Sequence, residues 1–138
     1  MLLGTAGFVL SVLNYLRDRA CITVTLDWDM KNSQTGETMG LIRATNTGRR
    51  PVFINVVSLG LPRGSRFTHL VMLDSIGGTK LGEGEQPMSV PVKYDGSLAE
   101  YSGIWRNMRA CATDSTGKKH YSRFPAKGAP VPQWVVAD

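Results

Sequence analysis

The first sixteen residues carry no charged side chain, and this run ends abruptly at Arg17-Asp18-Arg19. A helix over residues 1–16 would be about 24 Å long at ~1.5 Å per residue, short of the ~30 Å hydrocarbon core of a bilayer. No basic residue precedes the apolar stretch, and Asp18 and Arg19 suit neither a signal-peptidase site nor a lipoprotein site before Cys21. We therefore predict an apolar N-terminal helix over residues 1–19 that acts as an anchor or an assembly contact.

Small and polar residues within this segment recur on one face of a helix. They are Gly4, Gly7, Ser11 and Asn14, at i, i+3, i+7 and i+10. Such a stripe lets a second helix approach closely, in lipid or in a protein bundle. The alternative is the weaker side of an amphipathic helix packed on its own domain. The residues expected to make an assembly contact are Gly4, Gly7, Val9, Ser11, Val12, Leu13, Asn14 and Leu16.

The middle of the chain, residues 20–124, has the pattern of an all-β domain. Residues 21–29 alternate apolar and polar side chains, which is typical of a half-buried strand. Pro91 in the strand predicted at 88–94 indicates a sheet edge. The glycine-rich residues 76–87 read as a loop, and Ser97 with Glu100 resembles the capping box of a short helix. The other predicted strands are residues 39–46, 52–61, 67–73, 109–113 and 119–124, the last two forming a hairpin.

The spacing of these strands and turns predicts an immunoglobulin-like β-sandwich of about seven strands. The hydrophobic content of 42% and charged content of 20% exclude global disorder. Cys21 and Cys111 do not make a disulfide framework, and we favour two separate thiols over a bridge between terminal strands. The two cysteines and the two histidines are too far apart in sequence to match the ligand spacing of a metal site, so no metal or other cofactor is expected.

The C-terminal segment, residues 125–138, contains three prolines and then Trp134, Val135 and Val136. Prolines keep such a tail extended. Its apolar end is unusual for a free tail, so we expect these three residues to dock on a surface of their own domain or of a neighbour.

The formal net charge of +5 raises the question of an anionic partner. The best candidate contacts are Arg49, Arg50, Lys118 and Lys119, which lie in two predicted turns. We favour solvated turn charges, because two turns of a sandwich can lie at its opposite ends and no long basic run occurs. Nucleic acid is therefore an unlikely partner.

No arrangement of catalytic residues stands out. His120 lies near Asp114 and Ser115 in one turn, which is a weak coincidence for a nucleophilic site. No zinc-protease, P-loop or dinucleotide-binding motif occurs. We expect no enzyme, no catalytic residue and no small-molecule substrate.

Three turn motifs carry a resemblance to a known group of proteins. They are residues 45–52 (TNTGRRPV), 82–85 (GEGE) and 113–121 (TDSTGKKHY). Over residues 8–124 the chain resembles small uncharacterised bacterial and phage proteins with an N-terminal hydrophobic helix and an immunoglobulin-like β-sandwich. The resemblance implies a fold and no catalytic residue. Two departures are the short hydrophobic helix and the added proline-containing tail.

Together these features predict a non-enzymatic structural or assembly module that contacts copies of itself or neighbouring subunits. A subunit of a larger particle such as a phage virion, as a decoration or minor structural protein, is the preferred interpretation. The first alternative is a bacterial accessory domain that binds a protein partner and is tethered to a membrane. Arg17 and Arg19 would then keep the domain on the cytoplasmic side. The second alternative is a basic nucleic-acid-binding module.

Overall fold

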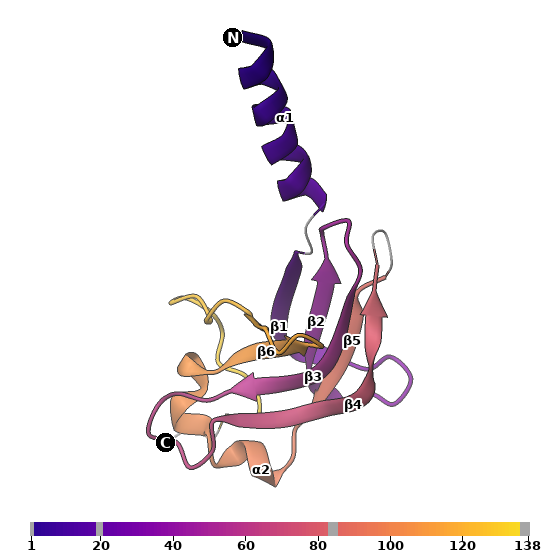
Figure 1. The fold of residues 1–138 in the computed structure, drawn as a ribbon. Helices are drawn as coiled ribbons and strands as arrows, with labels where there is room; N and C mark the ends of the chain where they lie inside the picture. The colour runs from indigo at the N-terminus through magenta and orange to yellow at the C-terminus, as the bar shows by residue number, and fades with distance from the viewer. Residues whose placement is uncertain (1, 19–20, 83–85, 136–138) are drawn as a thin grey trace.

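The computed structural model describes residues 2–18, 21–82 and 86–135 as one helix that projects from a mostly β domain (Figure 1). The element bounds along the chain are α1 (Leu2–Asp18), β1 (Ile22–Lys31), β2 (Thr38–Asn46), β3 (Val52–Gly60), β4 (His69–Leu81), β5 (Met88–Lys93), α2 (Gly96–Ala99), the 3₁₀ helix η1 (Ser102–Asn107), β6 (Arg109–Asp114) and β7 (Lys119–Tyr121).

The strands form two antiparallel sheets, as a sandwich requires. One sheet has the order β1-β2-β5 and the other the order β4-β3-β6-β7. The two antiparallel sheets confirm the prediction of an all-β domain. β5, which contains Pro91, lies at a sheet edge as expected, because proline has no N–H to donate to a second neighbour.

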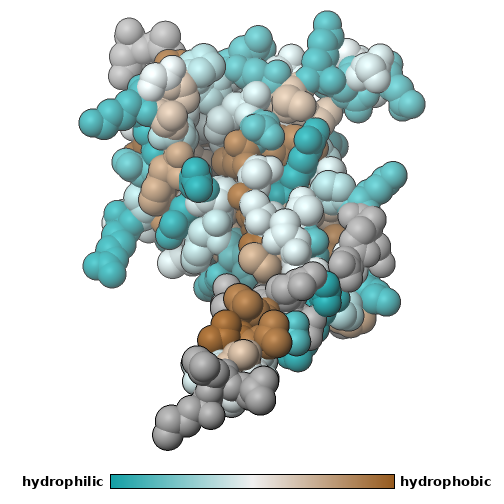
Figure 2. Space-filling view, turned by 90° about the horizontal axis from the view of Figure 1, so that it is seen from above, coloured by the Kyte–Doolittle hydropathy of each residue, from teal (hydrophilic) through white to brown (hydrophobic). Residues whose placement is uncertain are grey.

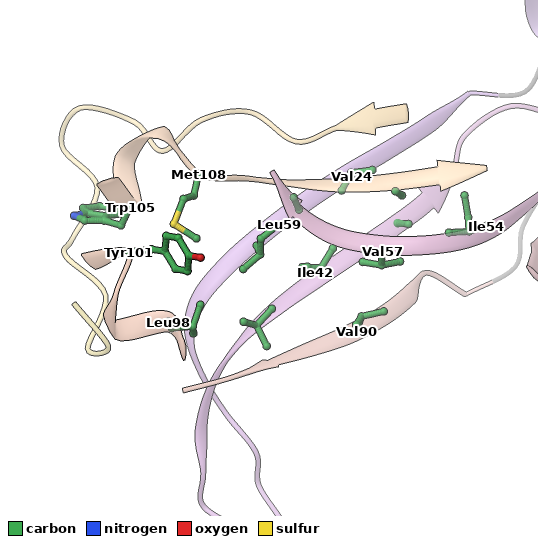
Figure 3. Packing of buried hydrophobic residues seen from close by; sticks show 14 of the residues in the cluster. Val24, Ile42, Ile54, Val57, Leu59, Val90, Leu98, Tyr101, Trp105 and Met108 are labelled. Carbon is green, nitrogen blue, oxygen red and sulfur yellow. The ribbon is translucent and has the colours of Figure 1, made fainter. Parts of the chain in front are cut away.

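The core lies between the two sheets, where side chains from both point toward one another (Figure 3). Ile42 of β2, Ile54 and Leu59 of β3, and Val92 of β5 are each 0–1% exposed. One end of this core is covered by Leu98 of α2 and by Trp105 of η1. The short helix predicted near residues 97–100 therefore exists and continues into η1.

Residues 76–81, the first part of the predicted glycine-rich loop, belong instead to β4. β4 runs through Gly77 and Gly78 to Leu81, paired with β3 across a register shift near Ile54. Gly78 adopts φ +73°, and a Cβ there would lie 2.6 Å from Asn55 Oδ1. Gly78 allows the irregular pairing, because a larger residue there would clash with Asn55 and Phe53 of β3.

The last hairpin is shorter than predicted, and the two cysteines are not bridged. β7 ends at Tyr121, earlier than the predicted residue 124, and Pro125 follows shortly after. Cys21 is exposed, Cys111 is buried in β6, and both are free thiols.

Candidate functional site

The N-terminal helix α1 is exposed over residues 4–15, the part whose side chains the structure describes. Every residue from 4 to 15 is exposed, and Phe8 and Tyr15 each expose 70% of their surface. Figure 2 shows the apolar side chains of α1 gathered in a hydrophobic projection, with hydrophilic side chains around the margin of the β-domain. The predicted contact residues that the structure finds exposed are Gly4, Gly7, Val9, Ser11, Val12, Leu13 and Asn14. Leu16 lies in α1, but its side chain is outside the described part of the structure.

The small-residue face of α1 is open to a close neighbour. A Cβ added at Gly4 or Gly7 would meet no atom within 4 Å. The Ser11 hydroxyl donates a hydrogen bond to the Gly7 carbonyl at 2.9 Å, so this polar group is satisfied within the helix. α1 therefore presents an apolar surface with a flat stripe, which its own β-domain does not cover.

The C-terminal segment, in contrast, folds back onto its own domain. Pro132 is fully buried and Trp134 is 8% exposed, with its ring centroid 5.1 Å from that of Trp28 in β1. The Gln133 backbone N–H donates to Asp29 Oδ1 at 2.9 Å. Val135 is half-buried, and Val136 lies outside the described residues. The sequence predicted that the tail docks either on its own domain or on a neighbour. The described part of the tail contacts its own domain.

A bulge in β1 creates the receiving surface for the tail. The pairing of β1 with β2 shifts register between Asp27 and Met30, and Asp29 adopts φ 59°. Aspartate tolerates this left-handed conformation better than most residues. The Tyr94 hydroxyl accepts the Asp29 N–H and donates to Asp29 Oδ1 at 2.8 Å. Burial, aided by the Asp29 carboxylate, raises the pKa of Tyr94 far above its usual value, so the hydroxyl stays protonated.

Gly40 of β2 lets the Trp28 ring approach the sheet closely. A Cβ at this position would lie 2.7 Å from Trp28 Cε3, too close for any real contact. Trp28 then forms ring contacts with both Tyr94 and Trp134. The indole N–H groups of Trp28 and Trp134 are buried with no protein acceptor in the described structure. Tail docking therefore depends mainly on apolar and ring contacts.

A second contact holds the segment that leads to the tail. The Arg106 guanidinium lies over the Trp105 ring, 4.5 Å from its centroid. The same guanidinium donates to the carbonyl oxygens of Ala126 and Lys127, each at 3.3 Å. η1 thus orients the start of the tail as well as covering the core.

The two basic turns lie at the same end of the domain, the end from which α1 projects. Ser115 donates its N–H to the Phe53 carbonyl at 2.9 Å, which places the β6–β7 turn beside the start of β3. Thr47 donates its N–H to the Cys21 carbonyl at 2.8 Å, which places the β2–β3 turn beside the start of β1. The exposed residues Arg49, Arg50, Lys118 and Lys119 therefore share one end with the base of α1.

Asp114 and His120 do meet, at 3.0 Å between Oδ2 and Nε2. Burial alone would raise the pKa of Asp114, but hydrogen bonds from Thr116, His120 and Lys118 outweigh it and lower the pKa below its usual value. Oδ1 accepts from the backbone N–H of Thr116 and of Lys118, as in a turn that an aspartate closes. The pair therefore fits a structural turn.

A cluster of stacked cationic and aromatic groups, which the sequence did not single out, lies at the end opposite α1. The Arg109 guanidinium lies 4.1 Å from the Tyr121 ring centroid and 4.7 Å from that of Phe124. His69 stacks on Tyr121, with centroids 6.2 Å apart. Burial, with help from the charge of Lys119, lowers the pKa of His69 and favours its neutral form. Spacing gave no signal, because His69, Arg109 and Tyr121 come from three different strands (β4, β6 and β7) and Phe124 follows β7.

Neither profiles of known protein families nor curated protein sequences gave a match to this chain. Among the described residues, no group of three or more histidine, cysteine or acidic side chains is placed to hold a metal ion. No helix in the described part of the chain has both the length and the apolarity needed to cross a membrane.

Proposed function

We propose that this protein is a non-enzymatic assembly module that docks through α1 to neighbouring copies or subunits. A place in a larger particle such as a phage virion, as a decoration or minor structural protein, is the setting we favour. The observation that carries the proposal is the exposure of every described residue from 4 to 15 in an uncharged helical segment. A helix whose exposed surface is mostly apolar becomes more stable when that surface is buried.

The energetics favour a partner for α1. The exposed large side chains on the helix are Phe8, Val9, Leu10, Val12, Leu13 and Tyr15. At about 1.5–3 kcal/mol for each large apolar side chain, burial contributes on the order of 10 kcal/mol before ordering costs. An isolated helix of this length is marginal in water. The contact that stabilises α1 must then come from outside its own β-domain.

The β-domain suits a scaffold role. We assign it to the immunoglobulin-like class, with β1-β2-β5 as strands A-B-E and β4-β3-β6-β7 as strands C′-C-F-G. It lacks the inter-sheet disulfide of antibody domains, because Cys111 on β6 is a free thiol. This class of fold serves many cell-surface and structural proteins, and the fold alone assigns no activity.

Cysteine cross-linking tests whether the small-residue face of α1 is the contact between copies. In a Cys21→Ser background, Gly7→Cys places a thiol on that face, and Thr5→Cys places one on the far side of the helix at a residue outside the predicted contact set. We expect oxidation to link Gly7→Cys copies at least fivefold more efficiently than Thr5→Cys copies, because helices approach most closely at glycine. Equal linking of both variants, or none in either, would contradict the proposal.

A second candidate is the membrane-tethered accessory domain. It is favoured by the basic residues that share an end with α1, Arg49, Arg50, Lys118 and Lys119, because cations near such an anchor attract anionic headgroups. Flotation with vesicles of phosphatidylcholine and phosphatidylglycerol tests it. This candidate predicts that the full chain floats with the vesicles and that a chain lacking residues 1–16 does not.

Nucleic acid remains the weaker alternative for the same four basic residues. The test is titration of labelled single- and double-stranded DNA at two salt concentrations. Phosphate contacts would weaken steeply as salt rises, so absent or salt-insensitive binding would exclude this function.

A further inference from the structure

A groove follows the open edge of β1. One wall consists of residues 22–29 in unbroken succession, and the other of residues 121–126 with Ala129 and Pro130. The groove has a volume of about 810 Å³. Successive side chains of a strand point to opposite faces, so consecutive lining residues place the groove along the backbone edge itself. The seven steps from residue 22 to residue 29 give it a length of roughly 23 Å at ~3.3 Å per residue.

The register of β1 shows which backbone groups face this groove. The Thr47 N–H donates to the Cys21 carbonyl, so Cys21 and Thr47 form a hydrogen-bonded pair. Pairing continues with Ile22 opposite Asn46, and hydrogen-bonded and non-hydrogen-bonded pairs alternate along an antiparallel ladder. The N–H and C=O groups of Ile22, Val24 and Leu26 therefore point away from β2. β1 is the outer strand of its sheet, so within the described residues these groups have no strand partner on the groove side.

The opposite wall is also a strand edge. β7 pairs only with β6 in the described structure, and Ser122 donates its N–H to the Ala110 carbonyl at 2.9 Å. By the same alternation, the backbone groups of Tyr121 and Arg123 point outward. Natural edge strands are usually protected by lysine, proline or short length. Residues 22–26 (ITVTL) have none of these protections.

At the end distant from α1, the groove adjoins a basic hollow of about 360 Å³. Tyr121 and Phe124 line both spaces, and Arg63, His69 and Arg109 line the hollow alone. No acidic residue is among the described residues that line this hollow. The Arg109 guanidinium is held in place by the two rings, with no carboxylate paired to it in the described structure. A fixed guanidinium of this kind suits a carboxylate that arrives from outside.

We propose that this groove binds an extended peptide of a partner protein as an added β-strand, with a carboxylate of that peptide on Arg109 and Arg63. The unpaired backbone groups recognise the peptide main chain, and the apolar lining recognises side chains at alternate positions. A whole sheet from a second copy would collide with the wall formed by residues 121–126. A nucleic acid strand would meet the exposed carboxylate of Asp27 on the β1 wall. The site is separate from α1 and does not depend on the proposed assembly role.

The test uses the full chain in a mild non-ionic detergent and a library of fluorescein-labelled octapeptides. The peptides alternate apolar residues with threonine and carry two glutamates, two lysines or two serines at either end. By fluorescence anisotropy we expect the glutamate-ended peptides to bind at least tenfold more tightly than the lysine-ended peptides. Arg63→Ala and Arg109→Ala should each remove this preference, whereas Arg50→Ala at the α1 end should leave it unchanged.

Strand pairing is tested with the best-binding peptide after N-methylation of alternate amides, which blocks its main-chain hydrogen bonds. We expect at least a tenfold loss of affinity, and slower amide exchange of Val24 and Leu26 when the unmethylated peptide is bound. The proposal is overturned if no library peptide binds, if methylation has no effect, or if both arginine variants keep the glutamate preference. Tighter binding of labelled oligothymidine than of every peptide would also overturn it.

Discussion

The two ends of this chain are both apolar, yet they have opposite structural roles. Trp134, near the C-terminus, is 8% exposed and lies against Trp28 of its own domain, whereas Phe8 of α1 is 70% exposed. The tail has a prepared surface, made by the bulge at Asp29 and the open space above Gly40. In the described structure α1 has no such surface. An apolar terminus therefore indicates a contact, and the receiving surface decides whether that contact lies within the chain.

Removal of the tail anchor should have the largest effect on stability. Trp134→Ala deletes a buried aromatic side chain and should lower the free energy of unfolding by about 3 kcal/mol, at the low end for buried tryptophan because the tail is terminal. Urea denaturation followed by circular dichroism measures this. Val131→Ala, at a residue 56% exposed, is the control and should change stability by less than about 0.5 kcal/mol. Equal effects of the two variants would mean that the tail does not dock as described.

The receiving surface can be disrupted without a change in the tail. Gly40→Ala places a Cβ 2.7 Å from Trp28 Cε3 and should lower the free energy of unfolding by about 2 kcal/mol, because Trp28 must move. The matched control is Gly103→Ala, where an added Cβ meets no atom within 4 Å. Limited proteolysis should also cleave the tail of Gly40→Ala faster than that of the control. Similar cleavage rates for the two variants would show that the position of Trp28 does not determine whether the tail docks.

The polar part of the tail contact should be smaller. Tyr94→Phe removes the hydroxyl that holds Asp29, and we expect a loss of about 1 kcal/mol. Since Asp29 also accepts the Gln133 N–H, the loss should shrink when Trp134 is already alanine. A double-mutant cycle measures this coupling. Fully additive effects would show that Asp29 does not link Tyr94 to the tail.

Acid should weaken the end of the domain that carries α1. The pKa of Asp114 is lowered in the folded state, so its contribution to stability is present above its usual pKa and is lost as pH falls through the lowered value. We expect the free energy of unfolding to decline as pH falls below about 4, near the usual pKa of an aspartate, and Asp114→Asn to flatten that decline. Asp27→Asn, at an exposed residue of β1, is the control. An unchanged slope in Asp114→Asn would contradict the assignment.

The smallest effect on stability should come from the removal of α1. A chain without residues 1–16 should keep its β-fold, with a change in unfolding free energy of less than about 0.5 kcal/mol, because α1 is exposed rather than packed on the sheets. Far-ultraviolet circular dichroism and urea denaturation measure this. Loss of the β-signal on deletion would show that the helix is part of the folded unit and would remove the contrast between the two ends.

Sequence patterns predicted what depends on local chemistry. The alternation in residues 21–29, the turn at Asp114 and the edge position of Pro91 all rest on neighbouring residues. The patterns failed where a distant partner decides the conformation. Gly77 and Gly78 were predicted to lie in a loop, but pairing with β3 makes them part of β4. The contact of Asp29 with Tyr94 and the stack on Arg109 join distant parts of the chain, so spacing could not reveal them.

The most direct test of the assembly role is size-exclusion chromatography with light scattering on protein prepared without detergent. It compares the full chain with the chain that lacks residues 1–16. We predict a soluble oligomer of defined mass for the full chain and a monomer for the shortened one. A full chain that is monomeric, or that stays with membranes until detergent is added, would contradict the claim that α1 packs against other protein chains.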